Sequence, residues 1–133
     1  MKNNKINILI VEDESITAMD IKKHLETNEN IAAHTAATGI DAVMLAEQIK
    51  PDLIIMDIML KGHLNGIDVA DIIAKKNSIP VIYLTAFTDD ETFLNAQLTN
   101  PFAFIGKPFH KDELQNTIAV ALKKFKIQYH SSV

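Results

Sequence analysis

The chain has 133 residues, 47 % of them hydrophobic and 23 % charged, which fits one globular domain with a single core and excludes a disordered chain. It contains no cysteine, which excludes disulfides, thiolate metal sites and cysteine nucleophiles. The net charge is −4 and all 13 basic residues are lysine, so we expect no direct binding of nucleic acid, because arginine is the preferred bidentate partner of guanine and phosphate.

Short apolar runs predict strands that are covered on both faces, because these runs do not alternate apolar with polar residues. They are too short to span a membrane, and the residues before the first run are too few for the apolar region of a signal peptide. We therefore expect a cytoplasmic protein without a membrane segment. In chain order the predicted strands are Ile8–Val11, the weaker candidate Ile31–Ala36, Leu53–Met56, Val81–Leu84 and Phe102–Ile105.

Apolar residues at helical spacing lie between and after these strands. In chain order they run from Ala18 to Leu25, from Ala42 to Ile49, from Ala70 to Ala74, through Leu94 and Leu98, and from Leu114 to Phe125. We interpret Leu94 and Leu98 as core or half-exposed residues. The alternation of strand and helix predicts an α/β fold, a doubly wound parallel sheet of five strands with helices on both faces. In such sheets ligands bind beyond the carboxyl ends of the strands.

Acidic residues follow two of the predicted strands at this edge of the sheet. Glu12 and Asp13 follow the first strand, and Asp57 follows the third. Asp57 is not expected to cap a helix, because the next helix should begin near Asn65. At a separation of about 6 Å and an effective dielectric near 20, each pair of carboxylates costs about 3 kcal/mol, which a bound Mg²⁺ relieves. The space between them, large enough for a phosphoryl group, would be completed by the hydroxyl of Thr85 and by Lys107.

Five short motifs in this order resemble the receiver domain of two-component response regulators. The resemblance covers about residues 6 to 126 and implies the flavodoxin-like (βα)5 fold with strand order 2-1-3-4-5. The motifs are Val11–Glu14, Ile55–Leu60, Asn65–Ile67, Leu84–Ala86 and Lys107–Phe109.

The resemblance implies a role for each matching residue. Asp57 would be the phosphoacceptor, and the donor would be a sensor histidine kinase, a phosphotransfer protein or a small acyl phosphate. Magnesium would be held by Glu12, Asp13, Asp57 and the backbone carbonyl of Met59. The phosphoryl group would be bound by Thr85, the Ala86 N–H and Lys107, which would precede a cis proline, Pro108, while Thr85 and Phe104 would switch the α4-β5-α5 face.

Two features depart from the usual pattern of the family. Glu12 stands where aspartate is commoner, which favours contact with magnesium through water. The loop from Leu60 to Gly66 is one residue longer than usual and lacks the proline that the family usually has there.

Met59 and Phe87 are apolar and bulky at the two positions best placed to orient the water that hydrolyses the phosphoryl group. Either they exclude that water and slow dephosphorylation, or they simply face solvent or a partner.

Other functions fit the sequence less well. An aspartate-nucleophile phosphohydrolase would need a second aspartate where Met59 stands, and a flavin-binding module would need a Gly/Ser/Thr-rich loop after the first strand. The chain is thus expected to be no enzyme beyond catalysing its own phosphorylation and slow dephosphorylation. We expect a receiver domain over 1–127 and a tail over 128–133 without an output domain, or else a receiver fragment of a larger regulator or hybrid kinase. Expected partners are the kinase or phosphotransfer protein, a downstream protein target and a second copy of the chain.

Overall fold

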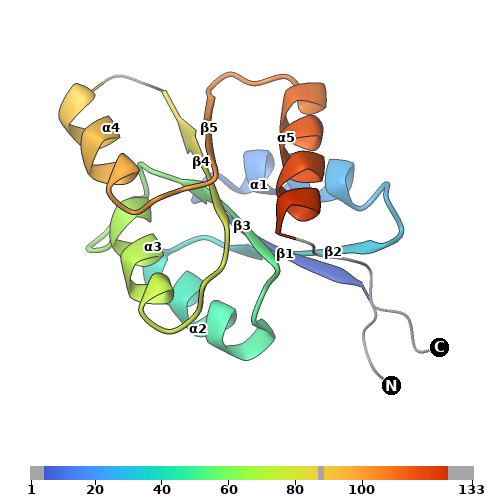
Figure 1. The fold of residues 1–133 in the computed structure, drawn as a ribbon, viewed down its shortest axis with the longest axis horizontal. Coiled ribbons are helices and arrows are strands. Elements are labelled where there is room, and N and C mark those ends of the chain that lie inside the picture. The colour runs from blue at the N-terminus through green and yellow to red at the C-terminus, as the bar shows by residue number, and fades with distance from the viewer. Residues whose placement is uncertain (1–4, 87–88, 126–133) are drawn as a thin grey trace.

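The computed structural model describes residues 5–86 and 89–125 (Figure 1). Its sheet has five parallel strands in the order β2-β1-β3-β4-β5, which confirms the predicted flavodoxin-like fold and strand order. Among the described residues no helix has the length and apolar character needed to cross a membrane. The elements are β1 Ile6–Val11, α1 Ser15–Leu25, β2 Ile31–Ala36, α2 Gly39–Ile49, β3 Leu53–Asp57, α3 Gly66–Ala74, β4 Val81–Thr85, α4 Asp90–Gln97, β5 Ala103–Gly106 and α5 Lys111–Lys124.

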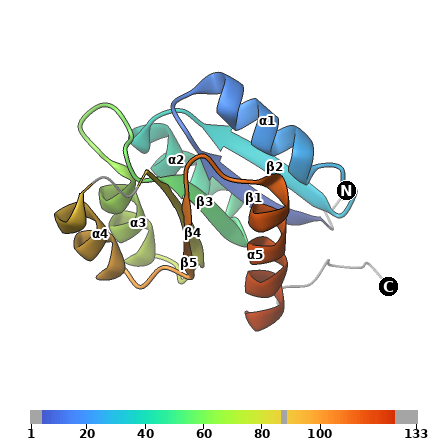
Figure 2. The same cartoon turned by 90° about the horizontal axis from the view of Figure 1, so that it is seen from above.

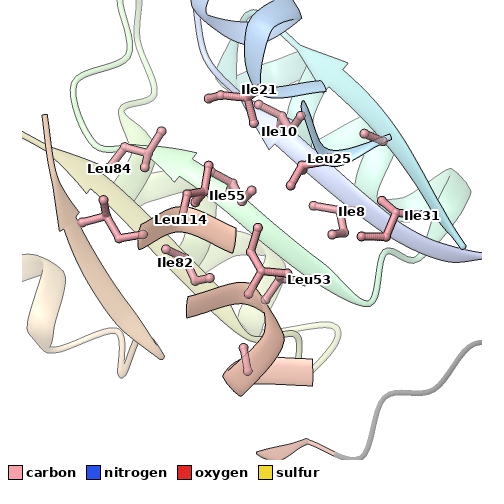
Figure 3. Packing of buried hydrophobic residues seen from close by; sticks show 14 of the residues in the cluster. Ile8, Ile10, Ile21, Leu25, Ile31, Leu53, Ile55, Ile82, Leu84 and Leu114 are labelled. Atoms are coloured by element: carbon pink, nitrogen blue, oxygen red, sulfur yellow. The ribbon is translucent and has the colours of Figure 1, made fainter. Parts of the chain in front are cut away.

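Strands β1, β3 and β4 are buried on both faces almost throughout, as their continuous apolar runs predict, whereas the edge strand β5 is only partly buried. Successive side chains of β1 point to opposite faces, so that Ile8 and Ile10 join one core cluster and Leu9 and Val11 the other. Helices α1 and α5 cover the first cluster, and α2, α3 and α4 cover the second (Figure 2). Figure 3 shows the first cluster, in which Leu114 of α5 lies close to the central strands. The two layers of helices leave the carboxyl edge of the sheet as the place for a site.

The structure shifts some element boundaries relative to the predictions. Asp57 and Thr85 are the last residues of β3 and β4 rather than the residues that follow them. The third helix begins at Gly66 and is capped by Asn65, whose side chain accepts the Asp68 N–H at 2.9 Å while Asp68 accepts the Asn65 N–H at 3.1 Å. This capping box confirms that the helix after Asp57 starts near Asn65.

Helix α4 differs from expectation in its orientation. Leu94 and Leu98, interpreted from the sequence as core or half-exposed residues, are 59 % and 79 % exposed. The buried residue of α4 is Ala96, and Phe93 is half-buried beside it. The helix therefore packs on the sheet through Phe93 and Ala96, and the two leucines face away.

A histidine in β2 lies in a partly buried polar contact. His34 stands opposite Leu9 of β1, and its Nε2 is 3.0 Å from Oδ1 of Asn7. Burial, followed by the positive charge of Lys22, lowers the pKa of His34. The folded protein therefore favours the neutral imidazole.

This lowered pKa predicts a pH dependence of stability. Between the lowered value and about 6.5, the ordinary pKa of histidine, the unfolded chain binds more protons than the folded one, so stability falls as pH falls through that window. We expect the urea midpoint of the wild type to fall between about pH 7.5 and about pH 5.5, and His34→Asn to remove part of that fall. An equally steep fall in both proteins would contradict the prediction.

Candidate functional site

Three carboxylates meet at the carboxyl edge of the sheet. Glu12 follows β1 directly, Asp13 comes next, and Asp57 ends β3, which lies beside β1. One carboxylate oxygen from each of the three residues lies within 4.8 Å of the other two. Glu12 and Asp57 are only 2 % and 5 % exposed, whereas Asp13 is half-buried. The juxtaposition predicted from the ends of the strands is therefore present.

Backbone N–H groups orient all three carboxylates. Two of the donors stand two residues further along the chain from the acid they contact, within the same turn. The third donor comes from the loop between β3 and α3, 48 residues away in the sequence. The pairs are Glu14 N–H to Glu12 Oε2 (3.1 Å), Met59 N–H to Asp57 Oδ1 (3.1 Å) and Lys61 N–H to Asp13 Oδ2 (3.0 Å).

Lys107 brings the positive charge to this cluster from the end of β5. Its Nζ is 2.9 Å from Oε1 of Glu12 and 3.2 Å from Oδ2 of Asp57. Its backbone N–H donates to the carbonyl of Thr85 at 2.7 Å, and this bond holds the backbone of Lys107 beside the end of β4. The peptide bond from Lys107 to Pro108 is cis, as the resemblance implies.

Burial and charge shift the protonation of the pair formed by Glu12 and Lys107. Burial raises the pKa of Glu12, and hydrogen bonds from Lys107 and the Glu14 N–H offset this only in part. Burial works to lower the pKa of Lys107, but its hydrogen bond to Glu12 and the negative charge of Asp57 outweigh that effect and raise it. Lys107 therefore remains an ammonium group at neutral pH.

The donor set of this cluster fits a hard divalent cation. Carboxylate oxygens are the ligands that Mg²⁺ prefers, and these three come close enough to share one ion. The ammonium group of Lys107 pairs with two of the three carboxylates, so excess negative charge remains for a cation to neutralise. The cluster Glu12, Asp13 and Asp57 can therefore hold a metal.

Thr85 and Ala86 lie at the same edge of the sheet. Leu84 pairs with Asp57 across β3 and β4, so Thr85 stands one position beyond the phosphoacceptor candidate. Thr85 is 8 % exposed, whereas Ala86 is exposed. The residue after Ala86 is Phe87, which is expected either to exclude water from the site or to face solvent or a partner, and it lies outside the described residues. Met59, its expected counterpart, is 63 % exposed.

Phe104 belongs to a stack of three rings that joins β4, β5 and α4. Its ring centroid is 5.6 Å from that of Tyr83 and 4.5 Å from that of Phe93. The hydroxyl of fully buried Tyr83 is 2.7 Å from Oγ1 of Thr99, just beyond the end of α4. Phe104 is thus in contact with α4 through Phe93.

Sequence reasoning missed two contacts of this region. The hydrogen bond from the Lys61 N–H to Asp13 depends on the path of a loop, and no spacing in the sequence marks it. The only signal was the unusual loop itself, one residue longer than usual and without proline. The ring stack was missed because Phe93 and Phe104 come from separate elements with no shared period.

Comparisons with known proteins agree with this geometry. The model of the response regulator receiver domain matches residues 8–119. The chain is 36 % identical over 119 residues to the transcriptional regulatory protein PdtaR of Mycobacterium tuberculosis, a match that covers 90 % of this chain and 58 % of PdtaR. It is 35 % identical over 116 residues to the phyllosphere-induced regulator PhyR of Methylorubrum extorquens, with 86 % and 43 % covered. The chain spans about half the length of these two relatives.

Solved structures give the same picture. The signal receiver domain of a modulated diguanylate cyclase from Desulfovibrio desulfuricans superimposes with a TM-score of 0.82 at 34 % identity, covering 91 % of this chain and 96 % of that domain. The receiver domain of the Francisella response regulator 1452 superimposes with a TM-score of 0.81 at 29 % identity, covering 91 % and 99 %. The likeness therefore extends over nearly the whole of each receiver domain.

Proposed function

The chain belongs to the response regulator receiver domain family of two-component signalling, and we propose that it accepts a phosphoryl group on Asp57 from a sensor histidine kinase or a phosphotransfer protein. The observation that carries this proposal is the position of Asp57. It is a nearly buried carboxylate at the end of β3, 3.2 Å from the ammonium group of Lys107 and beside two further acids. In the reaction a carboxylate oxygen of Asp57 bonds to phosphorus while the bond from phosphorus to the donor breaks.

Magnesium is the proposed cofactor, because receiver domains typically use it and the donor set fits it. Glu12, Asp13 and Asp57 would hold the ion, together with the backbone carbonyl of Met59. When bound, magnesium neutralises charge on the phosphoryl oxygens. Glu12, which is already paired with Lys107, would contact the ion through water.

The remaining site residues are proposed to receive the phosphoryl group. Lys107 would exchange its contact with the Asp57 carboxylate for one with the phosphate. The hydroxyl of Thr85 and the N–H of Ala86 would donate hydrogen bonds to phosphoryl oxygens. Such donors would stabilise the charge that the transfer brings to this edge of the sheet.

Phosphorylation is proposed to change the α4-β5-α5 face through Thr85 and Phe104. Movement of the Thr85 hydroxyl toward the phosphate opens space beneath it, and the Phe104 ring turns inward. Because Phe104 packs on Phe93 of α4 at 4.5 Å, this rotation would repack α4. Exposed Leu94 of α4 and Leu98 at its C-cap would then present a changed surface to a downstream protein or a second copy.

The direct test is incubation with a small acyl phosphate, followed by intact-mass measurement. We expect one phosphoryl group per chain in the presence of Mg²⁺ or Mn²⁺, and none when EDTA removes the metal. A wild-type chain that gains no phosphoryl group with either metal would overturn the proposed function. An adduct that forms equally well in EDTA would show that the metal is not needed for the reaction.

The switch has its own expected result. Thr85→Ala should still gain the phosphoryl group, but the amide NMR shifts of α4, β5 and α5 should change much less than in the wild type. Phosphorylation can shift this equilibrium only through contacts that differ between its two states, and the hydroxyl supplies one. Thr85→Ser keeps the hydroxyl and should respond like the wild type. Wild-type shifts in phosphorylated Thr85→Ala would contradict this role.

The division of the chain stays a prediction. We propose a receiver domain over 1–127 followed by a tail over 128–133, and of this chain the structure describes residues 5–86 and 89–125. The alternative is a receiver fragment of a larger regulator or hybrid kinase. The proposed chemistry is the same in either case, since every residue assigned to it lies within the family match.

A further inference from the structure

The loop between β3 and α3 is joined to the acidic cluster by one long-range hydrogen bond. The Lys61 N–H donates to Oδ2 of Asp13 at 3.0 Å. The backbone N–H groups that donate to Glu12 and Asp57 come from within the same turns, so these backbone hydrogen bonds form wherever those turns form. The contact of Asp13 with Lys61 instead requires the loop to be in place.

The burial of neighbouring residues keeps the Lys61 N–H in place. Leu60 is 6 % exposed and packs in the core cluster under α2 and α3, and Leu64 packs partly against the same cluster. The Gly66 N–H donates to the carbonyl of Ile58 at 2.9 Å and closes the base of the loop. Between these points Lys61 is exposed, and the loop projects from the molecule (Figure 2, green). A fixed donor therefore stands at the root of an exposed loop.

Asp13 is the acid whose orientation depends most on this donor. It is half-buried, whereas Glu12 and Asp57 are almost fully buried. Lys107 contacts Glu12 and Asp57, and its described ion pairs do not include Asp13. A carboxylate has two oxygens, so Asp13 can accept the N–H on one and offer the other to a cation.

We propose that the backbone N–H of Lys61 positions Asp13 for metal binding and that a bound metal in turn stabilises the loop. The inference rests on the proposed function, because it takes the acidic cluster as the metal site. Holding Asp13 toward Glu12 and Asp57 before the ion arrives removes part of the ordering cost of binding. The effect is reciprocal, since a metal that binds better when the loop is attached must also favour the attached loop.

The loop lacks the proline usual in the family, and a proline substitution in this loop therefore tests the inference. Lys61→Pro removes the N–H donor, and Lys61→Ala removes the same side-chain charge while keeping the donor. Loss of a hydrogen bond that orients a metal ligand typically weakens affinity by about tenfold or more, so we expect Lys61→Pro to bind Mn²⁺ about tenfold more weakly. Lys61→Ala should stay within about twofold of the wild type, because an exposed charge is screened by salt.

Calorimetric titration with Mn²⁺ and amide hydrogen exchange with Mg²⁺ give two readouts. In the wild type, saturating Mg²⁺ should slow exchange of the Lys61 amide, while the amide of exposed Gly62 should respond less. Equal Mn²⁺ affinity in Lys61→Pro and Lys61→Ala would overturn the inference. If Lys61→Pro does not fold, an unchanged Lys61 exchange rate in the wild type would overturn it alone. A wild-type chain that binds no Mn²⁺ would instead refute the metal site on which the inference rests.

Discussion

Asp57→Asn is expected to abolish the phosphoryl adduct that forms with an acyl phosphate and Mg²⁺. The amide keeps the size of the side chain and one oxygen, but it lacks the negative charge that makes the carboxylate a nucleophile. Asp57 is the acid of the cluster that combines near-complete burial at the end of a strand with a direct contact to Lys107 Nζ at 3.2 Å. Loss of this one carboxylate should therefore remove the acceptor altogether.

The control for this prediction is Asp71→Asn on α3. Asp71 pairs with Lys75 at 3.5 Å, and its side chain is 61 % exposed, away from the acidic cluster. Intact-mass measurement should show the full adduct in Asp71→Asn and none in Asp57→Asn. An adduct of undiminished size in Asp57→Asn would assign the acceptor role to another residue, and peptide mapping would then be expected to find it on Asp13.

Gly66→Ala is expected to destabilise the fold by about 3 kcal/mol or more, because the added methyl group has no space. A Cβ at this position would overlap the carbonyl oxygen of Asp57 and lie 2.9 Å from the Cα of Ile58. These are backbone atoms, so relief requires the end of β3 or the start of α3 to move. The same shift would displace Asp57, and we expect slower phosphorylation in whatever fraction of the variant folds.

Gly62→Ala is the control for Gly66→Ala, because it replaces a glycine in the neighbouring loop without creating a steric clash. Gly62 has a φ of 102°, and a Cβ there would meet nothing within 4 Å. Its substitution should cost about 1 kcal/mol through backbone strain alone. Urea unfolding measures both changes. A loss of stability in Gly66→Ala no larger than in Gly62→Ala would show that the backbone at Gly66 yields easily.

Much of this fold follows from local sequence features. Runs such as Leu53–Met56 are apolar at every position, which predicts strands covered on both faces, and strict alternation with helices predicts a parallel sheet. Parallel strands end at one edge, so Glu12, Asp13 and Asp57 had to meet there once β1 and β3 were neighbours. The acidic cluster was therefore predictable without coordinates.

The sequence did not determine which apolar stripe of α4 faces the sheet. Phe93 and Ala96 stand three residues apart, and Leu94 and Leu98 stand four apart, so both pairs fit a helical period. Only packing distinguishes them. In the structure Phe93 contacts Phe104 of β5 and Ala96 is buried, and this leaves both leucines exposed.

The tertiary structure also decided how Asp13 is held. A hydrogen bond between residues 48 positions apart depends on the path of the loop after β3, which is set by the burial of Leu60 and Leu64 and by the close approach of Gly66 to Ile58. Sequence periodicity describes neighbours within one element. By itself it therefore determined the strands, the helices and the meeting of the acids, whereas contacts between a loop and a distant turn arise only when the chain has packed.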